Sequence, residues 1–505
     1  MTYSIINEIV NKPPEQGGSL FIATLGEQKT LPLHELYSMA GQVANGLLAQ
    51  GITAGDTIGI LSDNCLEWVL LDLAALRIKV RTAGFDPGKF TAEPSLVRDY
   101  QLKCLFTDKK VDTACTAIRD IKAINAFLAD FPATLPSVEY TPDDTTTIKF
   151  TSGSTGIPKG LAATVGSIDA SLHGVQRIFA HGPEDSLFVF LPLSLLQQRY
   201  WIYSALKYGH DIVLSNYQSA FVFMAQRQPT VVMGVPAFFE AARQHILRQG
   251  GDEAAMKTQA RALFGERIRY LWTGSAPADT ATLDFYLQMG LPLYEGYGMN
   301  ETCIVTKNHP GASRPGSVGL VIDGKKVVID DNGNVIVYSE YPVNTRYLYA
   351  PEGASEKIFT PEGGVCTGDL GFIDKDGFLY IKGRSDNVIV LDNGKKIDVQ
   401  PIEARLRNEG AITECVIFSP QQTELVAVIS PASTPADTQA IHAALKSVNA
   451  ITEKDEFISR LVIASQPFSI DNGLLTSQYK PIRKAIFERY QHELNTAVKE
   501  LHHDH

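Results

Sequence analysis

One short stretch of the chain, KFTSGSTGIPKG from Lys149 to Gly160, is rich in small hydroxyl residues and glycine. It continues directly from a β-branched run that predicts a strand. Hydroxyl groups and backbone N–H groups from Thr151 to Gly156 can converge on an anion, and Lys159 adds a point charge. The ligand that such a loop favours is a phosphate chain. A Walker loop would require GxxxxGK[ST], which this stretch lacks, so we exclude a P-loop kinase or ATPase.

Four further side chains are of types that recognise parts of a nucleotide. Tyr297, in EGYG, offers a flat face for a base, and Glu301 is a hard oxygen ligand of the kind that magnesium prefers. Asp369, in CTGDLG, can accept two hydrogen bonds from ribose hydroxyls, and Arg384 is an always-charged donor. Taken singly, each has a structural alternative: a tyrosine in a tight turn, a solvated charge, or a surface ion pair.

The elements that position these residues alternate between helix and strand. Residues 33–52 place apolar side chains at spacings of three and four, which predicts a helix, and Asn64 is the expected N-cap of a second helix over 64–78. Alternation of this kind predicts parallel sheets covered by helices, with ligands at the carboxyl ends of the strands. The expected strands are 56–63, 103–108, 185–193, 211–215, 230–235, 268–274 and 291–298, and the expected helices that alternate with the later ones are 167–180, 199–209, 237–249 and 281–290.

From about Gly316 the pattern changes to short strands and Gly/Asp turns. The segments 324–340 and 368–384 each contain two β-branched or aromatic runs around DDNG or DKDG, which predicts two hairpins. A last segment of mixed pattern ends in a polar helix over about 480–503. We place a domain boundary near Arg384 to Asp386.

Composition limits the classes of protein to which the chain can belong. Its 505 residues predict at least two domains, and 44% hydrophobic with 20% charged residues is ordinary for a globular protein. No run approaches the roughly 20 apolar residues of a membrane helix, and the first residues are unlike a signal peptide, so we expect a cytoplasmic protein. The net charge of −11 disfavours non-specific binding to nucleic acid, and the six cysteines show no CxxC spacing for a zinc site.

The stretch TSGSTGIPKG resembles the phosphate-loop signature of the adenylate-forming superfamily, which contains acyl-CoA synthetases, luciferases and nonribosomal peptide adenylation domains. Further motifs of that family follow, in the order in which the family has them, over nearly the whole chain. Their sequences most resemble those of fatty acyl-CoA synthetases. They are GSAP at 274–277, EGYGMNET at 295–302, GSVG at 316–319, TGD at 367–369, GRSDNVIVLDNGKKI at 383–397 and LLTSQYKPIRK at 474–484.

The resemblance implies an α/β fold. It implies a large N-terminal adenylation domain over 1–384, with two helix-covered, mainly parallel sheets and a small β-barrel subdomain at about 316–384. A small, mobile α+β domain over 385–505 is expected to carry the catalytic lysine.

The resemblance also assigns roles to individual residues. It implies phosphate contacts from Thr151, Ser152, Gly153, Ser154, Thr155, Gly156 and Lys159, and adenine contacts from Gly274, Ser275, Ala276 and Tyr297. Further nucleotide contacts are expected from Glu295, Gly296, Gly298, Asn300, Asp369 and Arg384, magnesium contacts from Thr151 and Glu301, and acyl-pocket contacts from Leu195, Val235 and Trp272. Glu301 and Lys480 are the expected catalytic residues, Asp386 is the expected hinge, and Gly394 marks the expected thiol-acceptor loop.

The activity implied by the resemblance is ATP-dependent activation of a carboxylic acid. The acid attacks the α-phosphorus of ATP, pyrophosphate leaves, and Lys480 meets the charge on the α-phosphate. A rotation at Asp386 then presents the loop around Gly394 to a thiol. The implied cofactors are ATP and Mg²⁺, together with either coenzyme A or the phosphopantetheine of an acyl carrier protein. The expected protein is a monomer or a homodimer.

Three positions depart from the family's pattern. Asn300 stands where a threonine is usual, Leu195 where a histidine or other aromatic residue is frequent, and Gln198 where the long-chain branch has a glutamate. The apolar stretches LPLSLL, VPAFF and LWTGSAP favour an apolar acyl or aryl acid. Two alternatives remain open: transfer to an acyl carrier protein, and a nucleotide-binding protein without catalysis.

Overall fold

The computed structural model describes residues 3–110, 115–151, 158–391, 396–420, 423–453, 456–476 and 479–495. The chain forms two compact units, residues 1–367 with 372–381 and residues 368–371 with 382–505. The domain boundary near Arg384 to Asp386 stays a prediction.

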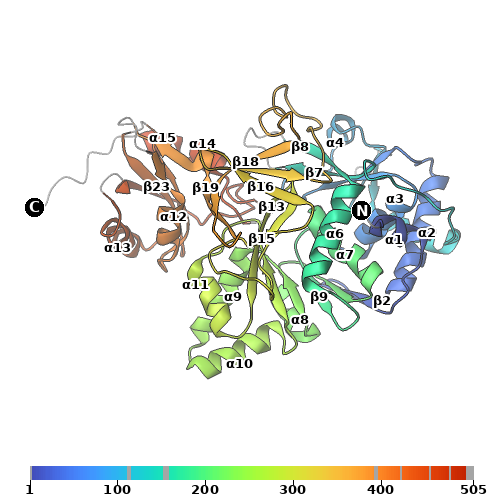
Figure 1. The fold of residues 1–505 in the computed structure, drawn as a ribbon, viewed down its shortest axis with the longest axis horizontal. Helices are drawn as coiled ribbons and strands as arrows, with labels where there is room; N and C mark the ends of the chain where they lie inside the picture. The colour runs from blue at the N-terminus through green and yellow to red at the C-terminus, as the bar shows by residue number, and fades with distance from the viewer. Residues whose placement is uncertain are drawn as a thin grey trace, which may run out of the picture. The chain divides into compact units, whose positions relative to one another are not determined.

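A nine-stranded sheet runs through the first unit, in the order β15-β14-β13-β12-β11-β9-β10-β1-β2. Figure 1 labels its strands β2, β9, β13 and β15. The central pairs from β1 to β13 are parallel, and the pairs at both edges are antiparallel. Its strands are β1 (Ser19–Ala23), β2 (Gln28–Pro32), β9 (Ser186–Val189), β10 (Asp211–Leu214), β11 (Val231–Met233), β12 (Tyr270–Thr273), β13 (Leu293–Met299), β14 (Cys303–Lys307) and β15 (Leu320–Val321).

A second, six-stranded sheet of the same unit has the order β6-β5-β3-β4-β7-β8. All its pairs are parallel except β7 with β8. Its strands are β3 (Thr57–Leu61), β4 (Arg81–Phe85), β5 (Cys104–Thr107), β6 (Ile118–Asp120), β7 (Thr145–Thr151) and β8 (Lys159–Thr164). The predicted mainly parallel sheets are therefore confirmed.

Helices cover both sheets and bury their apolar faces against them. One core cluster joins the faces of α2, α3, α6 and α7 with strands of both sheets, and a second joins α8 to α11 with the nine-stranded sheet. The helices are α1 (Ile5–Asn11), α2 (Leu33–Ala49), α3 (Leu66–Arg77), α4 (Pro94–Asp99), η1 (Ile121–Ala126), α5 (Phe127–Asp130), α6 (Val165–Phe179), α7 (Leu196–Tyr208), α8 (Ala220–Arg227), α9 (Pro236–Gln249), α10 (Glu253–Phe264) and α11 (Thr280–Gln288). Among the described residues, no helix combines the length and apolar character that a membrane crossing requires.

The predicted N-cap at Asn64 is wrong. Cys65 is the N-cap of α3, and the Asn64 amide instead donates to the carbonyl oxygens of Leu191 and Ser215. Its oxygen accepts a hydrogen bond from the backbone N–H of Leu193. Asn64 therefore links two segments that are far apart in the sequence, which outweighs its local capping preference.

The two predicted hairpins are confirmed, and they form a four-stranded sheet of order β16-β17-β18-β19. This sheet is curled into a half-barrel and corresponds to the predicted small β-barrel subdomain. Its strands are β16 (Lys325–Ile329), β17 (Asn334–Ser339), β18 (Gly364–Ile373) and β19 (Leu379–Arg384). In the first turn, one carboxylate oxygen of Asp330 accepts hydrogen bonds from the backbone N–H groups of Asn332 and Asn334.

The second unit contains a two-stranded and a three-stranded sheet, in the orders β20-β21 and β22-β23-β24. Its elements are η2 (Ser385–Asn387), β20 (Val388–Val390), β21 (Lys396–Asp398), α12 (Gln400–Arg407), β22 (Ile412–Phe418), β23 (Leu425–Pro431), α13 (Thr438–Asn449), β24 (Ile458–Ile463), α14 (Arg483–Arg489) and α15 (Gln491–Asn495). The predicted single polar helix near the C-terminus is wrong over its described part, since α14 ends at Arg489 and α15 begins at Gln491.

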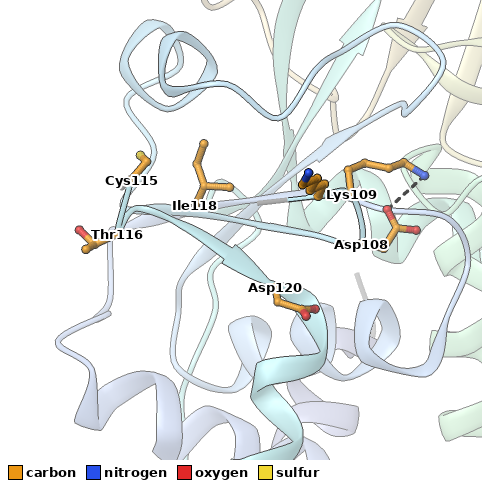
Figure 2. Close-up of a pocket in the computed structure, with 7 residues that line it drawn as sticks. Asp108, Lys109, Cys115, Thr116, Ile118 and Asp120 are labelled. Carbon is orange, nitrogen blue, oxygen red and sulfur yellow. Dashed lines mark ion pairs between the residues drawn. The ribbon is translucent and has the colours of Figure 1, made fainter. Parts of the chain in front are cut away.

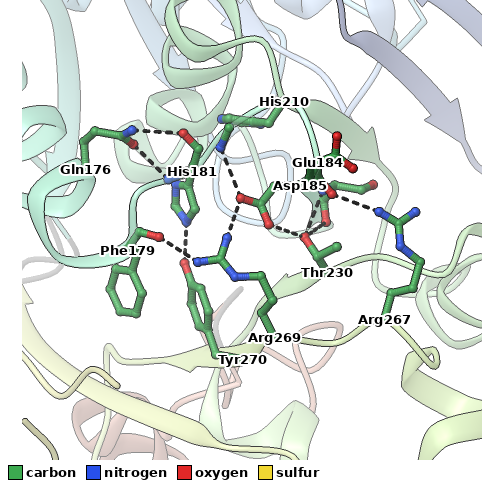
Figure 3. A network of polar contacts seen from close by, with 12 residues as sticks. Gln176, Phe179, His181, Glu184, Asp185, His210, Thr230, Arg267, Arg269 and Tyr270 are labelled. Atoms are coloured by element: carbon green, nitrogen blue, oxygen red, sulfur yellow. Dashed lines mark hydrogen bonds and ion pairs between the residues drawn. The ribbon is translucent and has the colours of Figure 1, made fainter. Parts of the chain in front are cut away.

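A polar network of buried residues and the exposed Arg269 links the segments next to α6, β10 and β12 in the first unit (Figure 3). The ring of His181 lies 2.5 Å from the hydroxyl of Tyr270, and Arg269 forms an ion pair of 2.5 Å with Asp185. Burial lowers the pKa of His181 to about 3 and that of His210 to about 4, so both rings are neutral near pH 7. These histidines are therefore structural groups of the core.

Candidate active site

The segment after β17 runs antiparallel to the beginning of β8 and carries Tyr347 to the predicted phosphate loop. The backbone groups of Gly160 and Leu348 exchange two hydrogen bonds, of 2.8 and 2.7 Å, and the Asn344 amide donates to the Ala162 carbonyl at 2.8 Å. This pairing places the ring of Tyr347 beneath Lys159, whose ammonium lies 5.0 Å from the ring centroid. A cation–π contact therefore joins the loop lysine to a tyrosine nearly 200 positions away.

The same tyrosine holds the predicted magnesium carboxylate. Glu301 is 6% exposed, and its Oε1 accepts a hydrogen bond from the Tyr347 hydroxyl at 2.5 Å. Burial and the charge of Glu301 raise the pKa of Tyr347, so its hydroxyl remains a donor at neutral pH. Lys159, Tyr347 and Glu301 thus form one connected group that presents a carboxylate and a cation.

A tight turn between β13 and β14 carries Glu301. The backbone N–H of Met299 donates to the Thr302 hydroxyl at 3.1 Å across this turn. Gly298 permits it, because a Cβ at that position would lie 2.0 Å from the Cys303 carbonyl oxygen. A side chain at position 298 would therefore displace the turn and Glu301 with it.

Two lysines, the buried Lys149 and the half-buried Lys325, support the turn. The Lys325 ammonium donates to the Thr302 carbonyl at 2.8 Å, and the Lys149 ammonium lies 3.6 Å from the sulfur of Cys303. Burial raises the pKa of Cys303, but Lys149 and Lys325 outweigh it, so the pKa is lowered overall. No local sequence pattern indicates this support, because its members come from three separate strands, β7, β14 and β16.

The predicted adenine residues lie on two adjacent parallel strand ends. β12 and β13 pair in register with Thr273 opposite Glu295, and a Cβ on Gly274 would lie only 3.2 Å from the Gly296 carbonyl oxygen. Ser275 is exposed, Ala276 and Asn300 are half-buried, and the half-buried Tyr297 packs against a small valine cluster. The structure therefore brings the GSAP and EGYG segments side by side.

Glu295 makes a hydrogen bond inside the protein that holds the GSAP loop in place. Its buried carboxylate accepts a hydrogen bond of 2.9 Å from the backbone N–H of Ala278. Burial raises the pKa of Glu295 to about 7, against the opposing effect of Lys307. The hydrogen bond from Ala278 to Glu295 thus positions the GSAP loop, which contains predicted adenine residues.

Of the three predicted acyl-pocket residues, Trp272 lines a small cavity at the carboxyl end of β12. Val235 is buried in the core as the N-cap of α9, and Leu195 is half-buried against the same core as the N-cap of α7. The cavity also contacts Gln198, which departs from the family's pattern.

A separate surface hollow of about 620 Å³ lies near the ends of β5 and β6 (Figure 2). One of its two described lysines, Lys109, forms ion pairs of 2.9 Å with Asp63 and 3.2 Å with Asp108. No predicted site residue is among its described lining, which is Asp108, Lys109, Lys110, Cys115, Thr116, Ile118 and Asp120.

The predicted ribose residues lie together in the second unit. The Arg384 guanidinium donates to Asp369 at 3.3 Å, and the Ser385 hydroxyl donates to the Gly368 carbonyl at 2.9 Å. Gly368 has a φ of +72°, and a Cβ there would lie 2.9 Å from the guanidinium. This glycine therefore allows Arg384 to reach the carboxylate.

Lys480 stands at the end of a turn that precedes α14. Its carbonyl accepts a hydrogen bond of 2.8 Å from the Thr476 N–H, and its own N–H donates to the Thr476 hydroxyl at 3.1 Å. The neighbouring Arg483 is instead a structural residue, since it forms an ion pair of 2.8 Å with the buried Glu403. Within this basic stretch, Arg483 is thus a structural residue, whereas Lys480 stands on a hydrogen-bonded turn.

Several predicted positions lie outside the described residues. They are Ser152, Gly153, Ser154, Thr155 and Gly156 of the phosphate loop and Gly394 of the acceptor loop, together with the side chains of Thr151 and Asp386. Their roles stay predictions.

Comparisons with known proteins agree with this assembly of motifs. Residues 13–340 match the family described as AMP-binding enzyme, and residues 386–502 match the AMP-binding enzyme C-terminal domain. The chain is 27% identical to the long-chain-fatty-acid–CoA ligase FadD15 of Mycobacterium tuberculosis over 89% of each chain. It is 26% identical to a carboxylic acid reductase of the same organism, over 97% of this chain and 48% of that protein.

Among solved structures, the fold is similar to the O-succinylbenzoate coenzyme A synthetase of Bacillus subtilis in complex with AMP. The TM-score is 0.78 at 21% sequence identity, over 95% of this chain and 98% of that chain. The B. subtilis protein has also been solved in complex with ATP and a magnesium ion, with a TM-score of 0.74 at 21% identity over 93% of this chain and 96% of that chain.

Proposed function

The chain belongs to the AMP-binding enzyme family of AMP-forming acid–thiol ligases, and from this premise we propose that it activates an apolar carboxylic acid, fatty or aryl, and transfers it to coenzyme A. The single observation that carries the proposal is the connected group of Lys159, Tyr347 and Glu301. It provides a cation and a carboxylate next to the loop expected to hold phosphates.

In the first step, a carboxylate oxygen of the acid attacks the α-phosphorus of ATP. The bond from that phosphorus to the bridging oxygen breaks, pyrophosphate leaves with its electron pair, and an acyl adenylate remains. Lys159 steadies the departing phosphates, while Tyr297 and the segment Gly274 to Ala276 hold the adenine. Asp369 and Arg384 hold the ribose.

The residues of the site fit a magnesium ion. Glu301 offers a buried carboxylate oriented by Tyr347, and magnesium commonly binds one or two carboxylates together with phosphate oxygens and water. The described part of the chain contains no cluster of three or more His, Cys, Asp or Glu side chains for a metal, which agrees with a site completed by the substrate. When bound, the ion supplies charge neutralisation for the phosphates.

Lys480 meets the negative charge that develops on the α-phosphate. A preorganised cation at that position stabilises the transition state more than the ground state, which is the condition for catalysis. In the second step, the acceptor thiolate attacks the acyl carbon and AMP leaves. The small C-terminal domain turns at Asp386 between the two steps, which removes Lys480 from the first reaction.

A screen of fatty, aryl and short-chain acids for pyrophosphate release tests this proposal. We expect release that depends on acid, ATP and Mg²⁺, and a thioester when coenzyme A is added. A thioester that forms only with an acyl carrier protein would replace coenzyme A as the acceptor. ATP binding without release for every acid would instead support a nucleotide-binding protein without catalysis.

A further inference from the structure

A small cavity lies beside the predicted adenine segment. It is located where α7 faces the carboxyl ends of β11 and β12, and its volume is about 20 Å³. A space of this size holds a body about as large as a water molecule. Its lining consists of Leu191, Gln197, Gln198, Trp201, Met233, Gly234, Trp272, Gly274 and Ser275.

Two tryptophans, Trp201 and Trp272, are part of the cavity lining. The ring centroids of Trp201 and Trp272 lie 5.2 Å apart in an edge-on arrangement. The ring of Trp272 is also fixed on one face, because the Lys307 ammonium lies 3.4 Å from its centroid. Protein interiors are close-packed, so two buried and fixed indole rings are a poor site for insertion of a long alkyl chain.

Two polar side chains of the lining are buried without a hydrogen-bond partner. Gln198 is 5% exposed and Trp201 is 1% exposed, and neither the Gln198 Oε1 nor the Trp201 Nε1 has a partner among the described residues. They lie three positions apart on α7, which places them on the same face of the helix. Buried polar groups are nearly always hydrogen-bonded in native proteins, so this unpaired pair at a cavity is a place where the polar group of a ligand can bind.

The charge of the cavity excludes an ionised tail. Among the described residues of the lining, none is an acidic or basic side chain that could pair with a second carboxylate or an ammonium. The nearby Lys307 already donates to the carbonyl oxygens of Thr273, at 3.1 Å, and Tyr294, at 2.8 Å. The polar group that fits is therefore neutral.

We propose that the acid is compact and that its far end carries a neutral hydrogen-bonding group, a hydroxyl or a primary amide, which Gln198 and Trp201 bind. A hydroxyl donates to the Gln198 oxygen and accepts from the Trp201 N–H, so it pairs both groups. This inference rests on the proposed function, and it narrows the expected fatty or aryl acid to a short or aryl acid with a polar tip.

Paired acids test the inference in the pyrophosphate-release assay. The pairs are butanoic with hydroxybutanoic acid and benzoic with hydroxybenzoic acid, and dodecanoic acid represents the long chains. We expect kcat/KM to be at least about tenfold higher for the hydroxylated member of the preferred pair, because a site built to bind a hydroxyl rejects the analogue without it. A preference for dodecanoic acid, or equal kcat/KM within both pairs, would overturn the inference.

Two variants assign the discrimination to the named residues. Gln198→Leu should reduce the kcat/KM ratio within the preferred pair to about 1, and Trp201→Phe should reduce it in the same direction while keeping a ring in place. Gln244→Leu, on the exposed face of α9, should leave the ratio unchanged. An unchanged ratio in both cavity variants would contradict the assignment.

The outcomes separate this inference from the proposed function. Efficient turnover of dodecanoic acid would leave the proposed function standing and overturn the inference alone. An absence of pyrophosphate release with every acid would overturn the proposed function, and the inference with it. A melting temperature of Gln198→Leu no lower than that of the wild type is also expected, because the substitution removes an unpaired buried oxygen.

Discussion

Tyr347 donates a hydrogen bond of 2.5 Å to Glu301 and carries the ammonium of Lys159 on the face of its ring. One side chain therefore connects the two charged groups that the sequence had placed separately. Hydrogen bonds to ligating carboxylates orient them, and their loss commonly reduces metal affinity by about 10–100-fold. Tyr347 is thus the positioning residue on which the proposed magnesium site depends.

Tyr347→Phe should raise the magnesium concentration for half-maximal adenylation by at least about tenfold, because the ring remains and only the hydrogen bond is lost. The measurement is the rate of pyrophosphate release as a function of magnesium concentration.

Tyr349→Phe is the matched control for that substitution. Tyr349 lies two positions away, and its hydroxyl donates to the Tyr100 carbonyl at 3.0 Å, away from Glu301. We expect its magnesium dependence to equal that of the wild type. Equal shifts in both variants would show a general effect of the segment and would contradict a specific role for Tyr347.

Glu301→Gln should reduce kcat/KM for ATP by at least about tenfold at a fixed magnesium concentration. The amide oxygen can still accept the Tyr347 hydrogen bond, so the variant removes the charge and keeps most of the geometry. Binding of ATP in the absence of magnesium, measured by calorimetry, should not weaken. A variant that keeps the wild-type magnesium dependence would exclude Glu301 as the metal carboxylate.

Acid should destabilise the protein through its buried histidines. The pKa of His181 is lowered to about 3 and that of His210 to about 4 by burial, whereas an unfolded histidine titrates near 6.5. Below pH 6.5 the unfolded chain takes up protons that the folded chain does not, so the free energy of unfolding falls as the pH falls towards 4. At pH 5 the loss is roughly 2 kcal/mol for each histidine.

Urea unfolding at pH 7 and pH 5 checks this expectation. Between pH 7 and pH 5, the free energy of unfolding of His210→Gln should fall by roughly 2 kcal/mol less than that of the wild type. His245→Gln, which changes an exposed histidine of α9, should lose as much as the wild type. The same pH dependence in all three proteins would show that other groups cause the acid sensitivity.

Lys480→Ala should reduce the adenylation rate by about 100-fold or more, which is the usual loss when one preorganised electrostatic contact is removed. Thioester formation from a supplied acyl adenylate should be spared, because Lys480 acts in the first step alone. Lys484→Ala, which alters a lysine of α14 located 3.8 Å from Glu488, should leave both steps intact. Equal losses in the two half-reactions of Lys480→Ala would contradict the two-step scheme.

Features set by local patterns could be predicted from the sequence. The alternation of apolar runs predicted the parallel sheets, and DDNG and DKDG predicted the hairpins, because turn chemistry and side-chain period are properties of neighbouring residues. Helix α10 was missed because it buries only Ala260 and Phe264 among its 12 residues, which leaves a weak apolar stripe. Asn64 was misassigned because its partners are more than 120 positions away.

The support of the candidate site had no such local signal. The sequence identified Glu301 and Lys159 through their motifs, but the contacts of Tyr347, Lys149 and Lys325 depend on how separate strands pack. The unpaired polar atoms of Gln198 and Trp201 likewise become visible only when burial is known. The motifs thus indicated the reaction, whereas the residues that orient the site could be identified only from the folded structure.

Exchange of labelled pyrophosphate into ATP, measured without any thiol, tests the central claim most directly. The reaction reports the reversible formation of an acyl adenylate and nothing later. We predict exchange that requires magnesium and a carboxylic acid and that falls by about 100-fold or more in Lys480→Ala. An exchange rate at background for every acid of a broad panel, in a protein that still binds ATP, would contradict the claim that this chain forms acyl adenylates.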